Sequence, residues 1–439
     1  MGARRCRAPQ PARVTLHRKT HITLFALLKS PTARRFFIAH FQSELGSGAA
    51  YVALVLVAYH RLHSAWAIAL VLLADFLPGI VFAAPFGALA DRMSRRRLAV
   101  GADILRAGAF IALAVVPSFA ATVGLALLAG FGGALFRPTV NAALPGLFAD
   151  EQRSPAIALF GVGVSVGLTV GPALTALVLL FSSATVVLAA NGVTFLLSAA
   201  LLSTLALDAG APSRPDAAAG SQDERQSLWS ATVEGMRSAA QIRGVRTLLV
   251  IATLSVLAGS LMNVAEPLLA TGPLHAGNSG YSLLVAVYGV AMIVGSLVLT
   301  RAGSSLGGLR GRLLLGLGLQ GAGMVGSAAA PSLSWAAASF AVTGAGNALI
   351  IGADIRLVQE LVHERLLGRV FGLRDMLANI AFVVAFLSAA AVLAALGIRA
   401  VFALGGGGLV MLAIGGLLTF RPDQSVEPIV VVPEPAGAS

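Results

Sequence analysis

Two carboxylates interrupt the apolar stretches of this sequence, and they are the residues best placed to do chemistry. Glu44 lies in the stretch Phe36–Tyr59, and Asp75 lies in the stretch Ser64–Ala90. At about 1.5 Å per helical residue, Asp75 falls near the middle of a membrane and Glu44 also lies inside it. A charge at that depth is costly and marks a functional site. We expect both groups to bind and release protons, with Asp75 the main one, although local pairing or plain contact with water would also accommodate them.

Three further charges form a supporting set. Asp103 and Arg106 stand three positions apart, so on a helix they share one face and can pair. We expect that pair at the membrane interface, where it would support the preceding connection. Arg137 either pairs during a conformational change or extends to the interface. Glu266 and Asp354 lie near predicted helix ends and are expected to be solvated.

Other kinds of chemistry find little support in the residue types. Cys6 is the single cysteine, so a disulfide framework and a thiolate metal site are excluded. Neither Lys19 nor Lys29 follows a glycine, and an ATP-binding Walker A loop is therefore absent. The seven histidines are scattered and form no H-E-x-x-H pair. We predict that the protein is not an enzyme and that it needs no cofactor.

The elements that must position these residues are membrane-spanning helices. Hydrophobic residues make up 57% of the chain and charged residues 11%, against about 25% charged in a soluble domain. The mean hydropathy is +0.86. Apolar stretches of about 20 residues recur, each long enough to cross a bilayer.

The connections between these stretches are basic on alternate turns, and this asymmetry predicts the topology. Of the 31 Lys and Arg residues, only Arg61 and Arg399 fall in the other set of connections. Because basic connections stay in the cytoplasm, both termini are predicted to be cytoplasmic. The net charge of +12 then suits anionic lipid and requires no nucleic acid.

The predicted fold class is an all-α membrane protein of twelve transmembrane helices in two pseudo-symmetric bundles. Two spacings indicate a duplicated six-helix unit: Gly87 and Gly295 are 208 positions apart, and the pair Asp150 and Glu364 are 214 apart. The connection 150–153 is expected to be a loop. The predicted segments are a basic tail (1–35), a first bundle (36–207), a linker with an amphipathic helix (208–245), a second bundle (246–420) and a disordered tail (421–439).

The residues Gly87–Arg96 resemble the motif G-x-L-A-D-R-x-G-R-R between helices 2 and 3 of the major facilitator superfamily. One position departs from it, because Ser94 replaces the second glycine. The resemblance implies that Asp91 faces the start of helix 11, where Arg369 lies, and that this contact closes the cytoplasmic side. The predicted conformational latch comprises Gly87, Asp91, Arg92, Arg95, Arg96 and Arg369.

Other segments are similar to the macrolide-efflux and enterobactin-exporter branch of that superfamily. They are Gln42–Gly48, Arg137-Pro138, Gly171-Pro172, Asn191–Ser198 and Gly368–Leu373. The resemblance runs from about Leu27 to Phe420. It implies a rocker-switch carrier that exports drugs, siderophores or secreted metabolites against proton entry, and it does not identify the substrate.

We therefore predict a secondary active transporter in the bacterial inner membrane, a monomer whose partners are the lipid bilayer and a small organic substrate. Proton-coupled antiport would supply the energy. Uptake by the same fold stays an alternative, because the sequence does not encode direction. A non-transporting sensor or assembly subunit is a second alternative.

Overall fold

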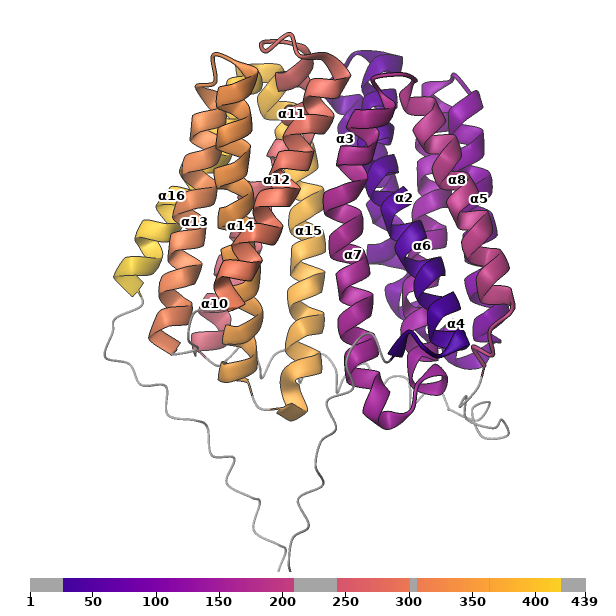
Figure 1. Ribbon diagram of the computed structural model, residues 1–439. Helices are drawn as coiled ribbons and strands as arrows, with labels where there is room; N and C mark the ends of the chain where they lie inside the picture. The colour runs from indigo at the N-terminus through magenta and orange to yellow at the C-terminus, as the bar shows by residue number, and fades with distance from the viewer. Residues whose placement is uncertain (1–26, 209–242, 301–305, 363, 420–439) are drawn as a thin grey trace, which may run out of the picture.

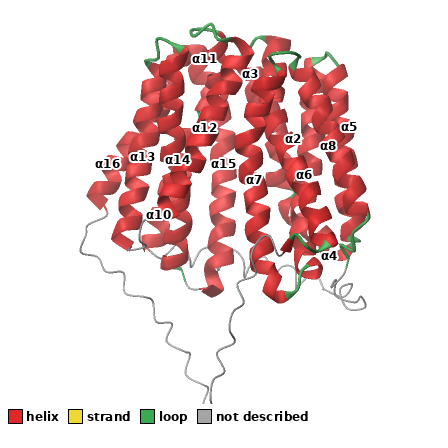
Figure 2. Ribbon diagram, in the orientation of Figure 1, coloured by secondary structure: helices red, strands yellow, loops and turns green. Residues whose placement is uncertain are grey.

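The computed structural model describes residues 27–208, 243–300, 306–362 and 364–419. Over these residues the chain forms fourteen α-helices and no strand (Figures 1 and 2). Ten helical segments are long and apolar enough to cross a membrane, with α10 and α11 counted as one segment. The predicted all-α membrane fold is confirmed. The predicted amphipathic helix (228–245) and the C-terminal tail (421–439) fall almost wholly outside the described residues.

The first half of the chain contributes seven helices that form six crossings. A bend at Phe82 divides one crossing into α3 and α4, because Pro85 has no N–H to donate to the carbonyl group of Val81. The helices are α2 (Pro31–Leu62), α3 (Ala65–Val81), α4 (Ala83–Arg92), α5 (Arg95–Val115), α6 (Phe119–Leu147), α7 (Asp150–Val178) and α8 (Ala184–Ser203).

The second half repeats this arrangement, again with one divided crossing. The break between α10 and α11 falls at Leu261. Two residues later, the Asn263 carbonyl group receives no helical hydrogen bond, because Pro267 has no N–H to donate. The helices are α10 (Arg243–Ser260), α11 (Met262–Thr271), α12 (Gly277–Thr300), α13 (Leu306–Ala328), α14 (Leu333–Leu361), α15 (Glu364–Leu396) and α16 (Ile398–Thr419).

Two predicted boundaries are wrong. Helix α2 begins at Pro31 rather than Phe36, because proline is well suited to the first helical turn. Residues 150–153 are not a loop but the first turn of α7. The acidic residue Glu151 suits that turn, since the N-terminus of a helix carries a partial positive charge.

The helices form two bundles that lie side by side (Figure 1). In the first, α2 packs on α7 and α8, α5 packs on α6 and α8, and α3 packs on α6. In the second, α14 packs on α12 and α13, and α13 packs on α16. The bundles meet where α7 contacts α12 and where α3 contacts α15.

The two ends of the molecule are named here by their connections. The basic end carries the connection between α4 and α5, with Arg92 and Arg95 on either side (bottom of Figure 1). The opposite end carries the connections at His63 and His275 (top of Figure 1), and each of these histidines has a φ of 48°. Histidine is among the few non-glycine residues that adopt this left-handed conformation readily.

Close helix crossings relate the two halves. A Cβ atom added to Gly130 of α6 would lie 2.0 Å from the carbonyl oxygen of Asp75 on α3. A Cβ atom added to Gly344 of α14 would lie 2.2 Å from the carbonyl oxygen of Tyr288 on α12. Gly130 and Gly344 are 214 positions apart. This register does not match Gly87 with Gly295, so that predicted pairing is wrong.

Candidate functional site

The two halves touch from the opposite end down to the middle of the bundle. At the opposite end, His60 Nε2 of α2 lies 3.1 Å from Asn278 Oδ1 of α12. Deeper in, the ring of Phe76 on α3 lies 5.6 Å from Phe382 and 5.8 Å from Phe386 on α15. These contacts join the two halves at the opposite end and near mid-depth.

A second crossing of the halves brings two backbones together. A Cβ atom added to Gly289 of α12 would lie 2.9 Å from the Cα atom of Thr169 on α7. The Thr169 hydroxyl group also donates a hydrogen bond of 3.4 Å to the Gly289 carbonyl group. Since small residues permit such close contact, this crossing provides a surface about which the halves can move.

Asp75 lies near mid-depth at the border between the halves. It is about 15 Å along α3 from the start of that helix at Ala65. Its side chain is half-buried, and its neighbour Phe76 contacts the second half. The carboxylate interacts electrostatically with Arg137 of α6 and Arg106 of α5. Asp75 thus combines partial access to water with nearby cations.

Arg106 and Asp103 pair as their spacing predicts, but they lie inside the first half rather than at the interface. Asp103 is 0% exposed, and its carboxylate accepts a hydrogen bond from Arg106. The Arg106 guanidinium lies 4.3 Å from the ring centre of Phe136 and 4.0 Å from that of Phe195. The pair is therefore a buried brace between α5, α6 and α8. Arg137, by contrast, is exposed.

Glu44 lies closer to the basic end than Asp75 does. It is about 27 Å along α2 from Leu62, and its side chain is 25% exposed. The carboxylate lies 3.9 Å from His40 Nδ1, while His40 Nε2 lies 2.8 Å from the carbonyl oxygen of Phe160. The structure therefore separates the two predicted carboxylates and gives Glu44 a local histidine partner.

The predicted latch is described only in part. The side chains of Asp91 and Arg369 lie outside the described residues. Gly87 is half-buried, and a Cβ atom added to it would have no neighbour within 4 Å. The remaining latch residues lie at the basic end: Arg95 is buried, and Arg92 and Arg96 are exposed.

Ser94, which departs from the family motif, has a structural role in the same connection. Its backbone has a φ of −57°, so the turn does not require glycine. The side chain caps α5 by accepting a hydrogen bond of 3.3 Å from the Arg97 amide. It also donates a hydrogen bond of 2.8 Å to the Asp208 carboxylate, which ties this connection to the end of the first half.

Glu266 was wrongly expected to be solvated. It is 4% exposed on α11, and its carboxylate accepts a hydrogen bond of 3.5 Å from the Tyr281 hydroxyl group of α12. Tyr51 and Tyr288 also interact with it electrostatically. The available sequence signal was that Glu266 lies inside the predicted membrane-spanning stretch, four residues before its end.

Asp354 was also wrongly expected to be solvated. It is 2% exposed on α14 and accepts a hydrogen bond from the Arg374 guanidinium group of α15. Arg374 also donates a 3.2 Å hydrogen bond to the neighbouring Asp375. This buried ion pair braces the second half as Asp103 and Arg106 brace the first.

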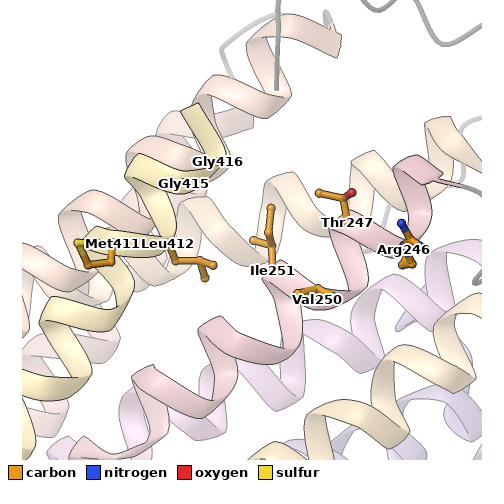
Figure 3. A pocket seen from close by; sticks show the side chains of 8 residues that line it. All are labelled: Arg246, Thr247, Val250, Ile251, Met411, Leu412, Gly415 and Gly416. Atoms are coloured by element: carbon orange, nitrogen blue, oxygen red, sulfur yellow. The ribbon is translucent and has the colours of Figure 1, made fainter. Parts of the chain in front are cut away.

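A groove on α10 and α16 contains none of the predicted site residues. Its volume is about 320 Å³, and Figure 3 shows its lining. The lining is mainly apolar, with the charged side chain of Arg246 on α10. No group of three His, Cys, Asp or Glu residues in the described ranges is close enough to hold a metal ion. The central carboxylates therefore remain the candidate site.

Comparisons with known proteins cover both halves of the chain. The family model of the Major Facilitator Superfamily matches residues 36–252 and 248–436. Macrolide efflux protein A of Streptococcus pyogenes is 24% identical over 383 residues, which is 85% of this chain and 92% of the relative. That of Enterococcus faecalis is 25% identical over 320 residues, 70% of this chain and 95% of the relative. The crystal structure of the nucleoside transporter NupG aligns with a TM-score of 0.71 at 12% identity, covering 88% of this chain and 99% of that one.

Proposed function

Because the chain belongs to the Major Facilitator Superfamily, we propose that this membrane transporter exports a small amphipathic organic compound in exchange for protons. It would act as a monomer and by alternating access, in which the two halves rock about the crossing at Thr169 and Gly289. The observation that carries the proposal is the position of Asp75, a half-buried carboxylate near mid-depth at the border between the halves.

The charges around Asp75 suit the exchange of a proton for a substrate. Ionised Asp75 is stabilised by Arg137 and Arg106, and the protonated form is stabilised by the surrounding apolar bundle. A substrate that enters beside Asp75 would change this balance and favour release of the proton. Coupling of this kind requires no bound cofactor, because the proton gradient supplies the free energy.

The direction of export rests on the topology. The Lys and Arg distribution supports a cytoplasmic basic end, and both termini would lie on that side in the bacterial inner membrane. The opposite end, closed by the contacts of Phe76 and His60, would then face outward. The structure would accordingly correspond to the state that accepts substrate from the cytoplasm.

The latch would stabilise the alternate, outward-open state. Asp91 is the residue before the last one of α4, and Arg369 is the sixth residue of α15. When the halves close at the basic end, a carboxylate beside the start of α15 would meet both a partial positive charge and an arginine. The contact would break on return to the inward-open state.

Macrolides are the first substrates to test, since two relatives are named for macrolide efflux. The purified full-length protein would be reconstituted in vesicles with a radiolabelled macrolide on one side. With a pH gradient imposed, we expect the macrolide to accumulate on the more acidic side, opposite to proton movement. A protonophore should abolish the accumulation, and reversal of the gradient should reverse it.

Three results would contradict the proposal. Accumulation on the alkaline side would indicate symport, and the protein would then be an importer. Transport that does not depend on the pH gradient would show that it is not coupled to protons. If macrolides and a panel of other amphipathic compounds neither move nor bind, the proposed substrate class is wrong.

A further inference from the structure

The most deeply buried carboxylate at the border between the halves is Glu266, which the exchange described above does not use. It is 4% exposed, and the hydrogen bond that it accepts from the Tyr281 hydroxyl group is long at 3.5 Å. No Lys, Arg or His within the described ranges forms an ion pair with it. A buried carboxylate without a cation is unfavourable when ionised and much less so when protonated.

The groups that face Glu266 come from both halves of the molecule. Tyr281 and Tyr288 belong to α12, and the Tyr288 hydroxyl group accepts a hydrogen bond of 2.6 Å from Asn347 of α14. Tyr51 reaches the cluster from α2 of the first half, and it interacts electrostatically with both Glu266 and Asp75. These interactions span the border between the halves.

The other helices packed against α11 place no cation beside Glu266. Helix α3 contributes Asp75, which connects to Glu266 through Tyr51. On α15, the charged residues whose side chains are described are Arg374 and Asp375; they lie toward the basic end, and Arg374 pairs with Asp354 and with Asp375. On α16, the Arg399 guanidinium group donates a hydrogen bond to the Ala330 carbonyl group. The charged residue of α10 nearest in sequence, Arg246, lies toward the basic end.

We propose that Glu266 is a proton-binding site that keeps the opposite end of the transporter closed while its carboxyl group is neutral. This inference deepens the proposed function and rests on it for the direction of proton movement. Loss of the proton would leave a negative charge among tyrosine side chains and apolar residues. Opening of the opposite end would relieve that cost, because water would reach the carboxylate.

The position of Tyr51 suggests how a proton passes between Glu266 and Asp75. With the opposite end open, Glu266 would take a proton from outside, and the neutral carboxyl group would allow the halves to close over it. The proton would then pass from Glu266 to ionised Asp75, beside Tyr51, and Asp75 would release it to the cytoplasm as substrate enters. Glu266 would lose its proton only when Asp75 can accept one, so closure and release would alternate.

The test measures opening of the opposite end as a function of pH, without any substrate. Cys6 is replaced by serine, and spin labels are attached to cysteines at Leu62 and His275, two exposed residues on different halves. Distances are measured in the purified full-length protein in lipid nanodiscs. We expect a longer-distance population to grow as the pH rises, with a long-to-short ratio that changes up to about tenfold per pH unit for one linked proton.

Three variants make the result specific. Glu266→Gln mimics the neutral carboxyl group and should hold the short distance at every pH. Glu266→Asp keeps the ionisable group and should keep the pH response, which shows that the site tolerates substitution. Glu360→Gln makes the same chemical change at an exposed position of α14 and should leave the response unchanged.

The inference is overturned if the wild-type distance does not respond to pH, if Glu266→Gln keeps the response, or if Glu266→Asp loses it. Failure of the proposed function looks different. Suppose that wild-type vesicles do not exchange substrate for protons, but the spin-label distance still depends on pH and Glu266→Gln removes that dependence. Glu266 is then a proton-binding site, and the proposed coupled export is wrong. If exchange is seen but Glu266→Gln keeps its pH response, only the role of Glu266 is wrong.

Discussion

The two halves share their close helix crossings but carry different polar residues at them. Gly132 of α6 packs on the backbone at Ala102 and on Arg106 of α5, whereas Gly346 of α14 packs on the backbone at Gly316 and Gln320 of α13. A third matched pair is Gly192 on Ala107 and Gly406 on Gly321. In all three sets, counting the crossing of Gly130 and Gly344, the paired glycines are 214 positions apart. The two halves therefore share small residues at these crossings but not charged ones.

This difference concerns the positions of the polar residues near the centre of each half. At matched crossings the first half carries Asp75 and Arg106, and the second half carries the neutral residues Tyr288 and Gln320. The second half instead places its central carboxylate at Glu266, which the 214-position register matches with the apolar Val52. Rocking requires similar packing in both halves, because each must keep its shape as a rigid body. Proton exchange requires a charge only at chosen positions, so the polar residues could diverge.

The largest expected effect comes from filling the shared crossings. Gly130→Leu and Gly344→Leu should each abolish folded protein, because even a Cβ atom would lie within about 2 Å of backbone oxygens. Gly133→Leu on the same α6 is the matched control, since a Cβ atom there would have no neighbour within 4 Å. Yield of monodisperse protein in size-exclusion chromatography measures the effect. Equal yields for Gly130→Leu and Gly133→Leu would refute the packing comparison.

The next effect concerns the charged brace that only the first half has at this crossing. Arg106→Gln installs the residue found at the matched position, but it leaves Asp103 buried without its cation. We expect a loss of about 3–5 kcal/mol in stability, since removal of one partner exposes the full cost of the buried charge. Adding Asp103→Asn should recover most of that loss in thermal unfolding. A double variant as unstable as the single would show that shape, not charge, holds this crossing.

The fold was predictable because its signals are local. Apolar runs and basic connections predicted the all-α membrane fold, since a helix satisfies its backbone within each run. The bends at Phe82 and Leu261 were not predicted, because the residues on both sides of each bend are apolar. Pro85 and Pro267 were the available signals for them.

A site residue could be placed from the sequence only where its position along a single helix determines its depth in the membrane. Counting residues placed Asp75 near mid-depth, because its helix begins close to the predicted residue. The same counting misplaced Glu266, which lies four residues from a predicted helix end. Its burial depends on Tyr281 and Tyr51, which come from other helices, and no pattern within α11 reveals them. The partner of Glu44, His40, was four positions away and could have been found.

Asp75 and Tyr288, whose carbonyl groups face the matched glycines Gly130 and Gly344, allow a direct comparison of coupling. Asp75→Asn mimics the protonated form, so the vesicles should still exchange substrate across a balanced membrane but should lose accumulation driven by a pH gradient. Tyr288→Phe removes a hydroxyl group at the matched crossing and should retain accumulation. Gradient-driven accumulation is measured with equal amounts of each reconstituted protein. Full accumulation by Asp75→Asn would show that a residue other than Asp75 couples transport to proton movement.

The latch motif is a further asymmetry, because the corresponding second-half segment contains Arg301, Arg310 and Arg312 but no Asp or Glu in its sequence. Asp91→Asn should leave membrane abundance and substrate binding normal and remove most of the transport, since the outward-open state loses its contact. Binding is measured by equilibrium dialysis and transport in vesicles. Unchanged transport would show that the contact does not control the cycle.

The smallest expected effect is at Glu44. Its carboxylate lies 3.9 Å from His40 Nδ1 and is 25% exposed, so a charge there already has a partner and water. Ionised Glu44 is therefore less costly than an unpaired buried carboxylate.

Glu44→Gln should accordingly lower gradient-driven accumulation to a level between those of the wild type and Asp75→Asn. The double variant should be no worse than Asp75→Asn alone, because one carboxylate already limits the cycle. If Glu44→Gln abolishes accumulation while Asp75→Asn retains it, the roles of the two residues are reversed. If both single variants and the double variant still accumulate substrate, coupling does not reside in the first half, and the contrast between the halves then points to Glu266 as the coupling carboxylate.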